Sequence, residues 1–342
     1  MILVTGGAGF IGSNFVLDWL ARHDEPVLNL DALTYAASPA NLAALQGDAR
    51  HVFVHGDIRD RALLDPLLAT HRPRAVLHLA AESHVDRSIA GPAAFIGSNV
   101  LGTGTLLEAV TAYWRGLPPA ARAAFRFLQV STDEVYGDLP PDAPPATETQ
   151  PYAPNSPYSA SKAAADHLVR AWHHTYGLPV LTTHSSNNLG PYQFAEKLVP
   201  RVLACAWAGE RLPLYGDGLQ QRDWLDVDDH CAALRLVLQA GVPGRRYNVG
   251  SGTSRSNLAL VQALCAELDR LRPDPAGPHA RLIHHVADRP GHDRRYALDT
   301  TRIRQELGWM PQRSFEASVA RTVRWYLDHP ERLASAVSAG PP

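Results

Sequence analysis

Two short segments near the middle of the chain carry residues that could perform chemistry together. Tyr158 and Lys162 are four positions apart, and on a helix such a pair shares one face. A phenol beside an ammonium can accept a proton from a sugar hydroxyl while a hydride acceptor oxidises the carbinol. Asp133 and Glu134 precede this pair and could supply an acid and a base. The four residues predict oxidation of a carbinol followed by an elimination.

A glycine-rich turn near the N-terminus indicates which hydride acceptor is used. Gly6, Gly9 and Gly12 follow an apolar run and open a predicted helix, so backbone amides and a helix N-terminus can approach a pyrophosphate. Asp31 ends the next predicted strand, where its carboxylate would bind ribose hydroxyls and repel a 2′-phosphate. The pattern predicts NAD rather than NADP. A tight packing turn with Asp31 as a helix cap is the alternative.

Short aliphatic runs alternate with helical stretches through the first half of the chain. We expect strands at 2–4, 27–30, 51–54, 75–78 and 127–130, and helices at 11–22, 101–114 and 158–176. Ser156, Pro157 and Gly177 suit the cap, first turn and end of the last helix. This alternation predicts an α/β fold with a Rossmann-type doubly wound parallel sheet.

The pattern changes from about residue 187, where glycine and proline are scattered through 190–218. A helix near 228–240 and a strand at 247–249 suggest a return to the sheet. We therefore expect a smaller, discontinuous C-terminal α/β substrate lobe. The predicted cofactor domain comprises 1–186 plus about 225–250, the substrate lobe comprises about 187–224 plus 251–332, and 333–342 form a loose tail.

Bulk composition narrows the class of protein. The chain has 342 residues, 19% of them charged, with a formal net charge of −2, so charge gives no argument for nucleic acid or an anionic membrane. Its three cysteines form no CxxC pattern, and His173–His174 and His284–His285 lack ligand-spaced partners, so we expect no disulfide framework and no metal. The start reads as strand and turn, and no apolar run approaches membrane length. We expect a cytoplasmic protein.

Several longer stretches resemble one family. They are Ala80–Ser88, Ser131–Gly137, Tyr158–Lys162, Ser186–Asn188, Arg222–Trp224 and Asp288–Tyr296. Together they are similar to the dTDP-glucose 4,6-dehydratase family of the extended short-chain dehydrogenase/reductase superfamily, from residue 1 to about residue 330. The Tyr/Lys pair is shared across the superfamily, whereas the Asp-Glu dipeptide and the Asp288–Tyr296 stretch are much narrower signals.

The resemblance implies a reaction in three stages. Tyr158 takes the C4 hydroxyl proton as hydride leaves C4 for NAD, and Thr132 hydrogen-bonds the same oxygen. The C4 ketone acidifies the C5 hydrogen, which Glu134 removes while a protonated Asp133 donates to the departing C6 hydroxyl. Hydride then returns to C6 and a proton to C5, which gives dTDP-4-keto-6-deoxyglucose and regenerates tightly bound NAD.

This chemistry makes demands on the surroundings of the acids and bases. A tyrosine phenol in water has a pKa of about 10 and is a poor base near neutral pH, so we expect Lys162 and the positive nicotinamide ring to lower the pKa of Tyr158. Asp133 and Glu134 must hold opposite protonation states, which requires different surroundings for two adjacent residues.

The resemblance also implies two sets of binding residues. The NAD set is Gly6, Gly9, Phe10, Ile11, Gly12, Asp31, Ala32, Leu33, Thr34, Asp57, Ile58, Leu79, Ala80, Ala81, Ser83, Ser98, Tyr158, Lys162 and Asn188. The nucleotide-sugar set is Ser83, Thr132, Asn187, Lys197, Leu198, Pro213, Leu214, Tyr215, Arg222, Asn257, Asp288, Arg289, Pro290, Gly291 and His292.

Three positions depart from the family pattern and leave fine specificity open: Leu189, Gln193 and Asp226. The sequence does not decide between thymidine and uridine nucleotides. The other functions considered are a UDP-hexose 4,6-dehydratase, a nucleotide-sugar 4-epimerase, a UDP-glucuronate decarboxylase and a non-catalytic cofactor sensor. The resemblance implies a homodimer, in which 101–114 and 158–176 could form a four-helix interface, although sheet packing explains their apolar faces equally well.

Overall fold

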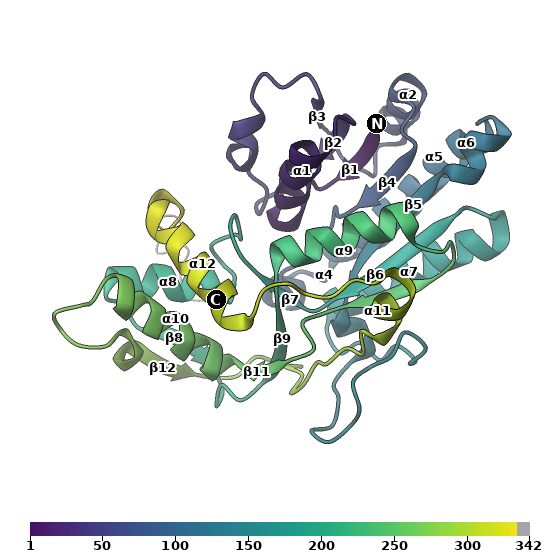
Figure 1. The fold of residues 1–342 in the computed structure, drawn as a ribbon. Helices are drawn as coiled ribbons and strands as arrows, with labels where there is room; N and C mark the ends of the chain where they lie inside the picture. The colour runs from purple at the N-terminus through teal and green to yellow at the C-terminus, as the bar shows by residue number, and fades with distance from the viewer. Residues whose placement is uncertain (334–342) are drawn as a thin grey trace.

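The structure, a computed structural model, describes residues 1–333 (Figure 1). The predicted tail therefore lies outside the described residues, except for Leu333, which is buried against the core of the second lobe.

A seven-stranded parallel sheet forms the centre of the first lobe, with the strand order β10-β6-β5-β4-β1-β2-β3. The strands are β1 (Ile2–Thr5), β2 (Val27–Asp31), β3 (His51–His55), β4 (Ala75–His78), β5 (Arg126–Thr132), β6 (Val180–Ser185) and β10 (Arg246–Val249). The order reverses between β1 and β4, which is where open parallel sheets bind ligands at the carboxyl ends of their strands. The predicted α/β fold and its parallel sheet are confirmed.

Helices cover both faces of this sheet (Figure 1). They are α1 (Phe10–Arg22), α9 (Val227–Ala240) and α11 (Thr301–Leu307) around one core, and α2 (Arg61–His71), α5 (Thr103–Arg115) and α7 (Pro157–Tyr176) around the other. Because helices cover both faces, every strand except the edge strand β3 is buried along nearly its whole length. Some of the buried strand residues are polar, among them Asn29, Gln129 and Thr183. Helix α11 packs against β10 and α9, so the chain returns to the first lobe within the range predicted for the second.

The second lobe lies beside the carboxyl edge of the sheet. It contains a three-stranded sheet, a two-stranded sheet and three helices. These elements are β7 (Asn187–Leu189), β9 (Gln221–Asp226), β11 (Ser254–Ser256), β8 (Leu212–Tyr215), β12 (Ile283–Val286), α8 (Leu198–Ala208), α10 (Asn257–Leu271) and α12 (Phe315–Asp328). The stretch 190–218, which we expected to be irregular, contains α8 and β8. Most residues of α8 are buried, so its sequence lacks a polar face that would mark a helix.

Helix α7 has the ends that its sequence predicts. Ser156 and Ser159 form a reciprocal capping box, Pro157 occupies the first turn, and Gly177 ends the helix with φ of 75°. Tyr158 and Lys162 both lie on its buried face.

The shorter helices connect these elements. They are α3 (Val85–Ala90), α4 (Pro92–Phe95), a π-helical turn at Ile96–Gly102, α6 (Pro119–Ala124), and 3₁₀ turns at Pro39–Leu45, Asp133–Tyr136 and His279–Leu282. Pro92–Arg115 run together as 24 helical residues, which by length and composition could cross a membrane. The expectation that no apolar run approaches that length was therefore wrong. This helix packs against α2 and α7 and carries buried Asn99 and Thr103, as a core helix does.

Candidate active site

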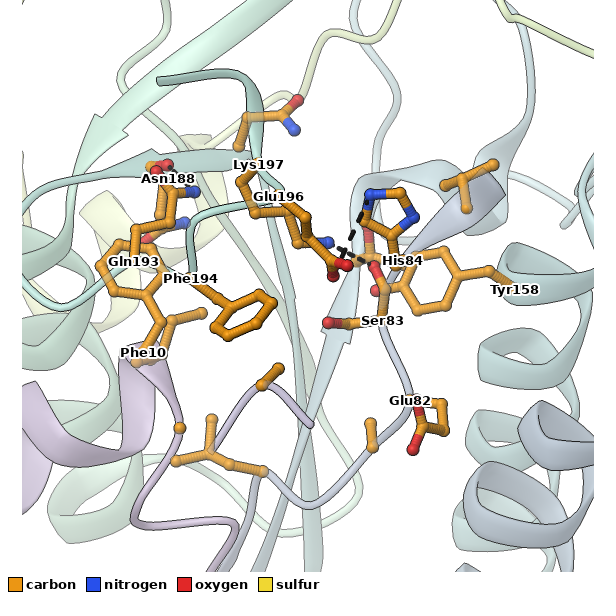
Figure 2. Close-up of a pocket in the computed structure, with 18 of the residues that line it drawn as sticks. Phe10, Glu82, Ser83, His84, Tyr158, Asn188, Gln193, Phe194, Glu196 and Lys197 are labelled. Atoms are coloured by element: carbon orange, nitrogen blue, oxygen red, sulfur yellow. Dashed lines mark hydrogen bonds and ion pairs between the residues drawn. The ribbon is translucent and has the colours of Figure 1, made fainter. Parts of the chain in front are cut away.

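A cavity of about 450 Å³ runs along the carboxyl edge of the sheet and continues beneath the second lobe. Residues from both lobes line it, and Figure 2 shows part of this lining. Most of the predicted binding residues lie here. The exceptions are Leu33 from the NAD set and Asp288, Pro290 and Gly291 from the sugar set.

The glycine turn leaves backbone rather than side chains at one end of the cavity. A Cβ on Gly12 would lie 2.1 Å from the Gly6 carbonyl oxygen, and one on Gly6 would lie 2.6 Å from the Ala80 nitrogen. Gly6 also has φ of 74°, a conformation that favours glycine. The turn is therefore packed against backbone on one side and open to the cavity at the start of α1, which suits a pyrophosphate.

Asp31 holds this turn from the end of β2. One carboxylate oxygen accepts from the Ala8 amide at 2.8 Å, and the other accepts from the Leu33 amide at 2.8 Å. A carboxylate has about four acceptor positions, so Asp31, which lines the cavity, can still accept from ribose hydroxyls. Leu33 contributes through its amide instead of its side chain. These residues fit a dinucleotide.

Tyr158 and Lys162 lie side by side on α7 beneath the end of β5. The Lys162 Nζ donates to the Val130 carbonyl at 2.8 Å, which fixes the ammonium in the cavity lining. Burial raises the pKa of Tyr158, and the charge of Glu134 raises it further, while Thr132 opposes them. The expected lowering of this pKa is therefore not supplied by the protein side chains. A positive nicotinamide ring, when bound, would act in the opposite direction to burial and Glu134.

Asp133 and Glu134 begin a 3₁₀ turn immediately after β5, and their surroundings differ. Asp133 is buried, its Oδ1 accepts from the Thr132 hydroxyl at 3.2 Å, and its Oδ2 has no hydrogen-bond partner in the described part of the chain. Burial, and then the charge of Glu134, raise the pKa of Asp133 well above its usual range. The raised pKa favours the neutral form of Asp133, which lines the cavity.

Glu134 lies nearer to positive charge. Burial raises its pKa, but Arg289, Arg222 and Lys197 all oppose that shift. The three cations favour the carboxylate form of Glu134 against the larger effect of burial, and the pKa of Asp133 is raised well above its usual range, so the two neighbouring carboxyl groups have unequal surroundings.

Two of these cations, Arg222 and Lys197, are held by hydrogen bonds to backbone carbonyls. Arg222 donates to the Asp293 and Gln221 carbonyls, each at 2.8 Å, and its guanidinium lies 4.2 Å from the centroid of the Tyr296 ring. The Lys197 Nζ donates to the Ser83 carbonyl at 2.7 Å (Figure 2). Hydrogen bonds to backbone carbonyls thus fix both positive groups in the lining of the cavity.

The comparisons with known proteins agree with this geometry. Residues 3–322 match the family described as GDP-mannose 4,6 dehydratase. A dTDP-glucose 4,6-dehydratase of Xanthomonas campestris is 62% identical over 95% of this chain and 92% of its own. One from Escherichia coli is 50% identical over 96% and 94%.

The chain belongs to the dTDP-glucose 4,6-dehydratase family.

Solved structures place this dehydratase family within a wider fold. The DesIV dTDP-glucose 4,6-dehydratase of Streptomyces venezuelae, crystallised with NAD and TYD, has a TM-score of 0.87 and 47% identity, covering 96% of this chain and 98% of its own. A UDP-glucose 4-epimerase of Thermotoga maritima with UDP-glucose has a TM-score of 0.82 at 28% identity, covering 96% and 99%. The fold therefore serves both reactions, and the site residues must distinguish them.

Several cavity residues of this dehydratase-family chain were absent from the predicted sets. Among them are Glu82, His84, Phe194 and Glu196, which Figure 2 shows around the middle of the cavity. Glu196 Oε1 lies 4.0 Å from the His84 ring, and its other oxygen accepts from Arg87 at 3.0 Å. Glu82 and His84 belong to the Ala80–Ser88 stretch that carries the resemblance, whereas Phe194 and Glu196 lie more than 100 residues away, so no spacing in the sequence joins the two pairs.

Asn99 is a further residue that the sequence reasoning missed. Its amide group accepts from the Glu82 backbone N–H at 2.8 Å and donates to the Glu82 carbonyl at 3.0 Å and to Ser161 Oγ at 2.8 Å. It therefore fixes the loop after β4 to α7. A buried amide in the π-helical turn of an otherwise apolar helix is the signal that could have identified it.

The three departures from the family pattern lie in different places. Leu189 is buried in the core of the second lobe, and Asp226 caps α9 and pairs with Arg321 at 2.9 Å. Only Gln193 lines the cavity, where its Nε2 donates to the Asn188 carbonyl at 3.2 Å. Leu189 and Asp226 therefore have structural roles, and Gln193 is the one of the three departures that faces the cavity.

We expect Gly12→Ala to weaken NAD binding by more than about ten-fold, since a Cβ there meets backbone atoms that cannot move aside. The NAD content of purified protein, and its recovery after added NAD, measure the effect. Gly104→Ala is the matched control, because that Cβ meets nothing within 4 Å on helix α5. Equal NAD content in the two variants would contradict the assignment of the turn.

We expect Asp133→Asn to stabilise the folded protein more at about pH 7 than at about pH 4. The folded chain keeps Asp133 neutral, whereas the unfolded chain ionises it above a pKa of about 3.9. The wild-type protein therefore loses stability as pH rises above that value, and the asparagine variant does not. Each unit of difference in pKa contributes about 1.4 kcal/mol.

The free energy of unfolding in urea, measured for both proteins across this pH range, tests that expectation. Comparing the two pH values cancels any packing difference between the side chains. A stability difference that does not change with pH would show that Asp133 is ionised in the folded protein.

Proposed function

We propose that the protein is a hydro-lyase that converts dTDP-glucose to dTDP-4-keto-6-deoxyglucose with tightly bound NAD. The observation that carries this proposal is the unequal environment of two adjacent carboxyl groups beside a Tyr/Lys pair. Burial raises the pKa of Asp133 well above its usual range and favours its neutral form, whereas three cations oppose the rise that burial causes at Glu134 and favour its carboxylate form. A 4-epimerase needs the Tyr/Lys pair but has no use for this acid and base.

NAD, when bound, supplies a hydride acceptor at C4 and returns the hydride at C6. Tyr158 accepts the C4 hydroxyl proton, and Thr132 hydrogen-bonds the same oxygen. Lys162, fixed on the Val130 carbonyl, contributes positive charge beside the phenol. Buried groups that do not reorient at the moment of reaction are the usual source of such stabilisation.

The elimination is the work of the residues after β5. With a carbonyl at C4, Glu134 removes the C5 proton, Asp133 donates its proton to the C6 hydroxyl, and water leaves. Glu134 then returns a proton to C5 as C6 is reduced. Tyr158 ends one proton richer and Asp133 one proton poorer, so transfer of one proton between them restores the site.

The substrate has two ends that the second lobe would hold. Arg222 and Arg289 line the cavity with charges suited to a diphosphate. Pro213–Tyr215 and Asn257 also line the cavity, and we assign the nucleotide to them. We assign NAD to residues 1–186 with about 225–250, and the nucleotide sugar to about 187–224 with 251–332, apart from α11, which packs against the first lobe. Thymidine is preferred because the relatives are named for dTDP-glucose.

A homodimer in the cytoplasm is part of the proposal. Ile89, Ile96 and Leu101 are 38%, 52% and 63% exposed along the helices between residues 85 and 102, an apolar surface that suits contact with a second copy. We expect a dimer by analytical ultracentrifugation, weakened by Leu101→Glu. A wild-type monomer at micromolar concentration would contradict this part.

One assay tests the reaction. Purified protein incubated with dTDP-glucose is expected to form a 4-keto product, followed by its absorbance in alkali. The 4-hydroxy epimer as product would indicate an epimerase. Carbon dioxide from UDP-glucuronate would indicate a decarboxylase, and turnover of UDP-glucose at an equal rate would remove the thymidine preference.

Glu134→Gln is expected to lower kcat by at least about 100-fold, because general-base catalysis contributes roughly that much. C4 oxidation should persist in this variant, so the absorbance of reduced nicotinamide should accumulate. Glu108→Gln, an exposed position on α5, is the control and should behave as wild type. Full turnover by the Glu134 variant would show that another group is the base.

A further inference from the structure

Helix α7 carries a third buried ionisable residue on the face that holds the Tyr/Lys pair. Asp166 is one turn beyond Lys162 and two turns beyond Tyr158, so the three side chains follow one another along the helix. Asp166 is 4% exposed and Lys162 is 5% exposed. Asp166 does not line the cavity, and the proposed reaction gives it no role.

The Asp166 carboxylate binds the end of β5. Its Oδ2 accepts from Ser131 Oγ at 2.6 Å and from the Tyr152 hydroxyl at 3.3 Å. Ser131 directly precedes Thr132 and follows Val130, whose carbonyl accepts from Lys162. Helix α7 is therefore tied to two successive residues of β5, immediately before the acid and the base.

The same carboxylate lies one helical turn from a buried positive charge. The Lys162 ammonium has no carboxylate within 4.0 Å in the described part of the chain, and a buried charge is costly without compensation. Asp166 Oδ1 is itself buried with no hydrogen-bond partner among the described residues. Burial lowers the pKa of Lys162, and the Asp166 charge opposes that change. One buried charge thus balances the other across a turn of helix.

We propose that Asp166 is a positioning residue that fixes the end of β5 through Ser131 and serves as the counter-ion of Lys162. Removing it would release the strand end that aims Asp133 and Glu134, and would leave a buried ammonium without a balancing charge. The measurements of kcat and KM that test this inference rest on the proposed function, whereas the chemical labelling of Lys162 does not.

Other titratable groups surround this pair and share its hydrogen bonds. His184 Nε2 lies 3.3 Å from Asp166 Oδ2 and 2.7 Å from the Tyr152 hydroxyl, and its Nδ1 lies 3.1 Å from the Tyr136 hydroxyl. The groups that face Asp166 or Lys162 from neighbouring elements are His78 on β4, Tyr136 after β5, Tyr152 before α7, Tyr158 on α7, His184 on β6 and Arg246 on β10. All of them remain in the test variants.

The test compares Asp166→Asn with Ser131→Ala and with Asp229→Asn. Asp229 is the matched control, since it is equally buried and holds the backbone at Gln312 and Arg313, away from α7. Asp166→Asn removes a negative charge near both Tyr158 and Lys162, and each group then loses its proton at lower pH. The limb of the pH profile of kcat that reports Tyr158 and the limb that reports Lys162 are therefore both expected to move to lower pH.

We also expect kcat of Asp166→Asn to fall by about ten-fold or more, with KM within about two-fold of wild type. Ser131→Ala removes the hydrogen bond but no charge, so kcat should fall while both limbs stay in place. Asp229→Asn should leave kcat and both limbs of its pH profile unchanged. An Asp166→Asn profile that coincides with that of wild type, with kcat within about two-fold, would overturn the proposal.

A second readout needs no turnover. The rate at which a small acetylating reagent modifies Lys162, followed against pH by mass spectrometry, reports the titration of its amine. Asp166→Asn should shift that curve to lower pH, and Asp229→Asn should not. An unshifted curve would overturn the counter-ion role even if dTDP-glucose proved not to be the substrate. Should Asp166→Asn fail to fold, Asp166→Glu, which keeps the charge and lengthens the side chain, should lower kcat without moving the labelling curve.

Discussion

The burial of two neighbouring carboxyl groups at the end of β5 is the constraint around which the rest of this structure is arranged. A carboxyl group removed from water keeps its proton unless charge or hydrogen bonds favour the anion. Asp133 receives one hydroxyl contact and the repulsion of Glu134. Glu134 receives three cations from the second lobe. The two carboxyl groups thus differ because burial raises the pKa of both, whereas Arg289, Arg222 and Lys197 all oppose that rise at Glu134 and only Arg222 of the three opposes it at Asp133.

The parallel sheet brings these groups to the cofactor. Strands β1, β2, β4 and β5 all end at the same edge, so the glycine turn, Asp31 and the acid–base pair meet there although they are far apart in sequence. Helix α7 then crosses beneath the end of β5 and presents Tyr158 and Lys162. The Tyr/Lys pair and the two carboxyl groups lie side by side because each is placed at the same edge of the sheet, and no single motif contains them all.

Hydrogen bonds outside the cavity lining hold these elements in position relative to one another. Asn99 joins the loop after β4 to α7, and Asp166 joins α7 to β5. Each contact uses a buried polar side chain, which is costly unless its partners are present. A neutral buried acid such as Asp133 also reduces stability at neutral pH. Reactivity and stability therefore oppose one another at this site, as is common in enzymes.

Local patterns in the sequence were enough to predict the α/β fold, the ends of α7, the glycine turn and the family, because these depend on periodicity, capping residues and motifs of fixed spacing. They also identified Tyr158, Lys162, Asp133 and Glu134 as a reactive set. They missed α8, whose buried faces leave no polar periodicity, and they placed α11 in the wrong lobe's range because chain order does not show where a segment packs.

The differences among the acids and bases, in contrast, are set by contacts that exist only in the folded chain. The sequence led us to expect Lys162 to lower the pKa of Tyr158, but burial and Glu134 raise it. The contrast between Asp133 and Glu134, and the links through Asn99 and Asp166, arise from residues of separate elements. Desolvation and charge act through space, and a sequence records distance only along the chain.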